Sequence, residues 1–132
     1  MYPSCTLGDP VRNIILAIDD SPARYARLEA LVEDVVVTQR PGLAWWMLDI
    51  QAEHMLGVCL DYDMPGRNGM WYCRTVLVHH PHMPIFITSA NPVGGDAMEF
   101  FLRENGATVG RGFPIGDWHD DALAFFRAHW EG

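Results

Sequence analysis

Acidic residues gather at two places in the sequence, each directly after an apolar run. Asp19 and Asp20 follow the first run, and Asp61 and Asp63 follow a later run at residues 56–60. Because like charges at close range disfavour joint ionisation, four carboxylates that meet in space need a counter-charge. Mg²⁺ or Mn²⁺ would supply it, since these cations prefer oxygen ligands and keep waters that a phosphate can replace. The four aspartates are therefore predicted metal ligands, whereas Asp19 and Asp20 alone would indicate only a helix-capping turn.

A second polar stretch, residues 89–95, follows another apolar run. Its hydroxyl, amide and two glycines lead into a predicted helix N-terminus, where free backbone N–H groups and the helix dipole favour an anion. The predicted phosphate-binding residues in this stretch are Ser89, Asn91, Gly94 and Gly95. The same residues are equally typical of an Asn-Pro turn whose glycines provide backbone freedom. The sequence supports both interpretations.

Five short apolar runs bounded by turn residues predict five buried strands. They span residues 13–18, 35–38, 56–60, 84–88 and 107–112. A predicted helix follows each strand, which indicates an α/β fold: a flavodoxin-like (βα)5 doubly wound parallel sheet with strand order 2-1-3-4-5. This order places the ends of the first and third strands side by side. The four aspartates are then expected to converge at that edge.

The second helix is predicted to bury four residues spaced i, i+3, i+4 and i+7. They are Leu43, Trp46, Met47 and Ile50. Since adjacent tryptophans cannot both point inward, Trp45 is predicted to lie outward. Together with Trp71 or Tyr72 it would form a patch for a protein partner or a homodimer.

Composition limits the function classes. The chain of 132 residues has a net charge of -8, which argues against an extended duplex nucleic acid as partner but not against a pocket for one phosphate. There is no apolar run of membrane-spanning length, no export signal and no metal-type cysteine spacing. A cytoplasmic protein with no membrane partner is predicted, as one domain over 1–132 with a leader at 1–11 and a core at 12–130. All nine basic residues are arginine, which excludes mechanisms that need a lysine of this chain.

Three motifs in order resemble the receiver domain of bacterial response regulators across residues 12–130. They are Asp19-Asp20, Leu60 to Pro65 with the later Gly69, and Ser89-Ala90. The resemblance implies that Asp61 accepts a phosphoryl group and that Ser89 is the switch hydroxyl. It also implies that Asp20 and Asp61 hold Mg²⁺ with help from Asp19.

The chain departs from that family at the lysine that contacts the phosphoryl group, where Phe113-Pro114 stands. Preorganised positive charge at a transferred phosphoryl group is usually a dominant catalytic contribution. Arg111 lies two residues earlier and, on a strand, would face the same side as Phe113, so it is a predicted phosphate-binding substitute. A guanidinium fork differs from a compact ammonium group, and a solvent-facing Arg111 is an equally supported interpretation.

A second resemblance is to a divergent receiver branch, the cyclic-phosphate-processing receiver domain. It rests on the Leu-Asp-x-Asp motif at 60–63, the Ser-x-Asn-Pro-x-Gly motif at 89–94 and the missing lysine. The chain differs from this branch at Thr88, where a histidine is expected. This resemblance implies action on terminal or cyclic phosphates of nucleotides or RNA ends, with Asp61 and Ser89 as catalytic residues.

Three functional hypotheses remain. The first is an atypical receiver-like domain whose acidic metal pocket binds or processes a phosphate of a small nucleotide or an RNA end. Its enzymatic form is a metal-dependent phosphoesterase, and the sequence leaves open whether the chain is an enzyme. The second is a stand-alone receiver phosphorylated on Asp61 in signal transduction. The third is a non-catalytic pseudo-receiver that binds a protein partner through its tryptophan faces.

Overall fold

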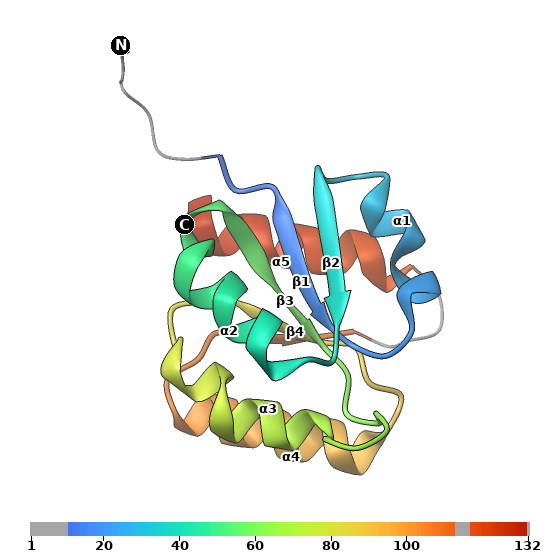
Figure 1. Cartoon of the computed structure of the whole chain (residues 1–132), viewed down its shortest axis with the longest axis vertical. Helices are drawn as coiled ribbons and strands as arrows, with labels where there is room; N and C mark the ends of the chain where they lie inside the picture. Colours follow the sequence, from blue (N-terminus) through green and yellow to red (C-terminus); the bar gives the residue numbers. More distant parts are fainter. Residues whose placement is uncertain (1–10, 113–116, 132) are drawn as a thin grey trace.

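Five parallel strands form one sheet in the computed structural model, which describes residues 11–112 and 117–131 (Figure 1). The strands are β1 (Ile14–Ile18), β2 (Asp34–Thr38), β3 (Met55–Leu60), β4 (Ile85–Ile87) and β5 (Val109–Arg111). Their order is β2-β1-β3-β4-β5, so the predicted flavodoxin-like fold and strand order are confirmed. Residues 1–10 of the predicted leader and Phe113-Pro114 lie outside the described residues.

Helical segments follow every strand, as expected from the alternating pattern. They are η1 (Pro22–Tyr25), α1 (Ala26–Glu29), α2 (Pro41–Ile50), η2 (Ala52–His54), α3 (Gly69–Thr75), η3 (Leu77–His79), α4 (Pro92–Glu104) and α5 (Trp118–Glu131). Within the described ranges, none of these helices has the length and apolar character needed to cross a bilayer.

The sheet is covered on both faces because strand side chains alternate between two apolar clusters. Leu16 and Ile18 of β1 pack with α2, α3 and α4, whereas Ile15 and Ala17 pack on the opposite side with α1 and α5 (Figure 1). The central strand β3 is buried at every position. Polar residues are therefore excluded from the central strands β1 and β3, and the acidic residues follow where these two strands end.

Parallel pairing brings the ends of β1 and β3 to the same edge of the sheet. Ile18 of β1 is the register partner of Leu60 of β3. The next residues continue the ladder, since Asp19 N donates to Thr38 O at 3.1 Å and Asp61 N donates to Ile18 O at 3.0 Å. The predicted meeting of the two acidic turns is thus built into the register.

The predicted inward face of α2 is confirmed for Leu43 and Met47 and is wrong for Trp46 and Ile50. The helix buries Ala44, Met47 and Leu48, while Trp46 is 48% exposed and Ile50 is 61% exposed. Nearly every residue of α2 is apolar, so the i, i+3, i+4 pattern fits more than one face equally well. Contact with the sheet selects the face one position away from the predicted one.

The predicted outward patch of aromatic residues is wrong as well. Trp45 is half-buried against the core and lies 5.6 Å from the His80 ring, measured between ring centroids. Tyr72 is fully buried and its hydroxyl donates to the Gln39 carbonyl. Trp71 is half-buried, with the Arg67 guanidinium carbon 4.2 Å from its ring centroid. Trp46 is the exposed tryptophan of the α2 pair.

Candidate functional site

Three carboxylates converge at the carboxyl edge of the sheet. Asp19, Asp20 and Asp61 each offer one oxygen, and the three oxygens lie within 4.8 Å of one another. Asp19 and Asp61 are buried and Asp20 is exposed. Asp63, also predicted as a metal ligand, is exposed and is not part of this cluster. Three oxygen donors at this spacing suit a hard divalent cation such as Mg²⁺, which takes one or two carboxylates and keeps its other waters.

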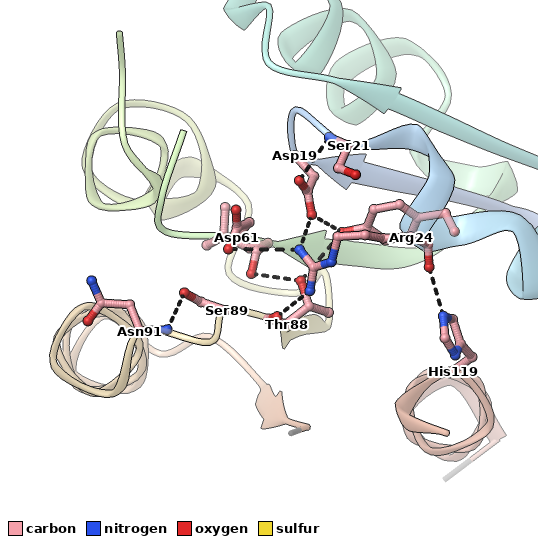
Figure 2. Close-up of polar contacts among 10 residues, drawn as sticks. Asp19, Ser21, Arg24, Asp61, Thr88, Ser89, Asn91 and His119 are labelled. Atoms are coloured by element: carbon pink, nitrogen blue, oxygen red, sulfur yellow. Dashed lines mark hydrogen bonds and ion pairs between the residues drawn. The ribbon is translucent and has the colours of Figure 1, made fainter. Parts of the chain in front are cut away.

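A cation that the sequence pattern does not predict lies between two of these carboxylates. Arg24, on η1 just after the first acidic turn, donates from Nη1 to Asp19 Oδ2 at 2.6 Å. The same nitrogen lies 4.0 Å from Asp61 Oδ1. Figure 2 shows the guanidinium in the middle of the site, pointing from η1 toward the ends of β3 and β4. The available signal was an arginine in the first helical turn after an acid pair, in a chain without lysine.

Arg24 is held from several sides. Its Nη2 donates to the Thr88 carbonyl at 2.7 Å, which ties η1 to the end of β4. Its own carbonyl accepts a 2.8 Å hydrogen bond from His119 Nε2 on α5 (Figure 2). Trp118, next to His119, has its ring centroid 6.0 Å from the guanidinium carbon. The residue is therefore positioned by β4 and α5 together.

Asp19 has both of its oxygens in use. Oδ1 accepts from the Ser21 amide at 3.1 Å, and Oδ2 accepts from the Tyr25 hydroxyl at 2.7 Å as well as from Arg24. The carboxylate is only 1% exposed, so these donors replace its lost hydration. Ser21 makes no side-chain cap bond at the start of η1. Asp19 is thus an anchor for Arg24 and Tyr25 in this structure.

Asp61 stands at the end of β3 in a different environment. It is 7% exposed, and burial raises its pKa from 3.8 to about 6, with the neighbouring charge of Asp19 acting in the same direction. Arg24, the Tyr62 amide and the Ser89 hydroxyl oppose this rise in the pKa of Asp61. The carboxylate is therefore mostly ionised at neutral pH and becomes neutral in mildly acidic solution.

The loop from Ser89 to Gly95 satisfies its own polar groups. Ser89 Oγ accepts from the Asn91 amide at 3.1 Å, and Asn91 Oδ1 caps α4 by accepting from Gly94 N at 2.8 Å. Gly95 N donates to the Asn91 carbonyl at 2.8 Å. The two glycine amides predicted to bind phosphate are thus engaged in the start of α4.

Close packing favours a glycine at position 94, whereas at position 95 the movable end of the Arg111 side chain could give way. A Cβ on Gly94 would collide with the Tyr62 ring, and one on Gly95 would collide with the Arg111 guanidinium. Asn91 has one further contact, since its Nδ2 donates to Asp63 Oδ1 at 3.3 Å. This bond joins the loop after β4 to the turn after β3.

Arg111 points to α4 and is paired there. Its Nη1 bonds to Asp96 and lies 3.4 Å from Glu99 Oε1, and its Nη2 lies 3.4 Å from the Pro92 carbonyl. Among the described residues, the cation within 4.0 Å of the Asp61 carboxylate is Arg24 and not Arg111. Arg111 could contact a phosphate at Asp61 only after leaving the carboxylates of Asp96 and Glu99.

Solved structures of receiver domains share this fold. The chain is similar to the response regulator domain of Thermotoga maritima CheB, with a TM-score of 0.62 and 14% identity over 92% of this chain and 98% of that one. It is similar to the BeF3-activated N-terminal receiver domain of Klebsiella pneumoniae RstA, with a TM-score of 0.65 and 24% identity over 91% and 100%. It is also similar to a LuxR-family two-component response regulator from Aurantimonas, with a TM-score of 0.64 and 19% identity over 91% of this chain and 86% of that one.

The identities of 14%, 19% and 24% establish a shared fold only. No family model matches the sequence, and no curated protein matches it. The chain therefore has the CheY-like receiver fold, with an acidic cluster at the ends of β1 and β3. The resemblance to the cyclic-phosphate-processing branch finds no support among these structures.

Proposed function

We propose that this chain is a receiver-like domain that accepts a phosphoryl group on Asp61 in signal transduction. The observation that carries the proposal is the place of Asp61. It is a buried carboxylate at the end of the central strand, beside Asp19, Asp20 and Arg24, in a fold shared with receiver domains.

In the proposed reaction an oxygen of ionised Asp61 attacks the phosphorus of a small phosphodonor, and the bond from phosphorus to the leaving group breaks. The product is an acyl phosphate on Asp61, and the leaving group departs with its electron pair. Mg²⁺ or Mn²⁺, held by Asp20 and Asp61 with Asp19 in reach, would neutralise charge on the transferred group. Ser89 lies near Asp61 (Figure 2), and its hydroxyl lowers the pKa of that carboxyl.

Intact-mass measurement tests this reaction. After incubation with a small phosphodonor and Mg²⁺, the wild-type chain should gain the mass of one phosphoryl group, and Asp61→Asn should gain none. Asp63→Asn is the matched control, because it removes an exposed carboxylate two residues away and should leave the adduct intact. An unmodified wild-type chain, or an adduct that persists in Asp61→Asn, would contradict the proposal.

A second candidate is binding or hydrolysis of a terminal or cyclic phosphate on a nucleotide or an RNA end, by a metal-dependent phosphoesterase. The observation in its favour is the Asn91 Nδ2 to Asp63 Oδ1 contact, which links the Ser-x-Asn loop to the second aspartate of Leu-Asp-x-Asp. Ser89 and Asn91 would then hold phosphate oxygens, with Gly94, Gly95 and Arg111 as further candidates once released from their present bonds.

Incubation with a nucleoside cyclic phosphate and Mg²⁺ separates the two candidates. Hydrolysis that is lost in Asp63→Asn and Asn91→Ala supports the second, while an Asp61 adduct without hydrolysis supports the first. The first candidate implies a phosphodonor and a responding protein as partners. The second implies a phosphate-bearing small molecule or RNA end. If neither product forms, the protein-binding pseudo-receiver hypothesis remains, with Trp46 as its exposed tryptophan.

A further inference from the structure

We infer that Arg24 is a built-in counter-cation of the acidic cluster, which a divalent metal ion must displace in order to bind. This inference rests on the proposed function, because it concerns the same carboxylates. In this inference, the Arg24 side chain competes with the metal ion for the carboxylates. Metal affinity would then be set by the Arg24 contacts as well as by the aspartates.

The Arg24 guanidinium and a divalent metal ion would both use the carboxylates of the acidic cluster. Arg24 Nη1 is 2.6 Å from Asp19 Oδ2 and 4.0 Å from Asp61 Oδ1, and these carboxylates supply two of the three clustered oxygens. A divalent cation on these carboxylates would lie beside the guanidinium. Repulsion between two cations a few ångströms apart opposes their joint occupancy of the cluster, so metal binding is favoured when the guanidinium moves away.

Arg24 is a fixed occupant. Two hydrogen bonds hold both ends of the residue (Figure 2). Arg24 Nη2 donates to the Thr88 carbonyl at 2.7 Å, and the Arg24 carbonyl accepts from His119 Nε2 at 2.8 Å. Its side chain is nevertheless 27% exposed, so the guanidinium has a direct way out to solvent. A bound metal would therefore break the links to Asp19 and Thr88 without unfolding η1.

Displacement predicts a specific change in affinity. When an internal group occupies a site more than 90% of the time, it lowers the apparent affinity for a competing ligand at least about tenfold. Arg24→Gln should therefore bind Mn²⁺ at least about tenfold more tightly than the wild-type chain. Arg27→Gln is the matched control, since it removes the same charge from α1 but only breaks an exposed pair with Asp120. It should bind Mn²⁺ as the wild type does.

The experiment is a titration with Mn²⁺ in which free metal is followed by electron paramagnetic resonance, repeated with Mg²⁺ as competitor. Tighter binding by Arg24→Gln alone supports the inference. Equal binding by all three chains overturns it and leaves the metal part of the proposed function standing. No binding by any chain overturns both. The phosphoryl adduct on Asp61 is measured separately, so its failure in chains that bind metal as expected overturns only the proposed function.

A second measurement avoids the Arg24→Gln variant if that chain does not fold. In the wild-type chain labelled with ¹⁵N, the Nε–H resonance of Arg24 should shift as Mg²⁺ is added, with the midpoint found in the Mn²⁺ competition. The Arg27 resonance should stay in place. An Arg24 resonance that is unchanged at saturating Mg²⁺ overturns the inference.

Discussion

Two arginines near the ends of the parallel strands make similar bonds in different surroundings. Arg24 bonds to Asp19 and lies 4.0 Å from Asp61, and Arg111 bonds to Asp96 and lies 3.4 Å from Glu99. Their own side chains are 27% and 26% exposed, so they are alike in burial.

The partners differ. The side chains of Asp19 and Asp61 are 1% and 10% exposed, whereas those of Asp96 and Glu99 are 75% and 29% exposed. A buried carboxylate that loses its cation keeps the cost of its desolvation, while an exposed one regains water. The burial of the acid therefore decides how much an arginine contributes to stability, and the pocket at Asp61 depends on Arg24.

Removing Arg24 is expected to have the largest effect on stability. Arg24→Gln leaves the Asp19 charge buried, and the free energy of unfolding should fall by about 2–4 kcal/mol at pH 7.5. The loss should be smaller in the presence of Mg²⁺, which would replace the missing charge. Urea unfolding followed by tryptophan fluorescence measures both quantities.

Arg27→Gln is the control for this experiment, because it breaks only the exposed pair with Asp120 and should cost less than about 1 kcal/mol. Equal losses in the two variants would remove the distinction between the buried and the exposed acids.

The sequence predicted the acids of this pocket but not its cation. Apolar runs fix where strands end and parallel order fixes which ends meet, so the positions of Asp19, Asp20 and Asp61 followed from pattern alone. Arg24 reaches the site through a long side chain, and periodicity describes which face a residue occupies, not how far its head group extends. Strand alternation led instead to Arg111, whose partners on α4 come from a separate helix.

The face of α2 was missed for a related reason. Its residues from Leu43 to Leu48 are all apolar, so the inward side is chosen by packing on the sheet and not by the polar pattern. The central strand, in contrast, is buried on both faces, and its continuous apolar run was sufficient to predict it.

Asp61→Asn should increase stability in a pH-dependent way. The folded-state pKa of Asp61 is raised to about 6 from 3.8, so between these values the folded chain binds more protons than the unfolded chain. Stability therefore falls as pH rises through this window and is level above it. Removing the charge should raise the free energy of unfolding by roughly 1–3 kcal/mol at pH 7.5 and by about half as much at pH 5.

Urea unfolding at both pH values measures this effect, with Asp63→Asn as the exposed control that should stay within about 0.5 kcal/mol of wild type. If Asp61→Asn destabilised the chain at pH 7.5, the charge of Asp61 would be compensated by Arg24 more fully than its burial indicates.

Asn91→Ala tests whether the loop after β4 has a role beyond capping. Asn91 caps α4 through Gly94 N, and Asn68 caps α3 in the same way through Trp71 N at 3.0 Å. Each alanine variant should lose about 1 kcal/mol of stability, since one helix-end donor is left unpaired. Thermal unfolding measures the loss. An Asn91→Ala chain that also loses cyclic-phosphate hydrolysis, with Asn68→Ala unaffected, would show that the loop serves the pocket.

Arg111→Gln should have the smallest effect of these variants. Because Asp96 is largely exposed, the free energy of unfolding should fall by less than about 1 kcal/mol, and the loss should shrink further in high salt, which screens such pairs. The Asp61 adduct and Mn²⁺ affinity should both match wild type. If Arg111→Gln instead abolished the adduct while its stability stayed near wild type, Arg111 would have to leave Asp96 and Glu99 during the reaction. The pocket would then draw on both arginines, and burial of the acids would no longer separate their roles.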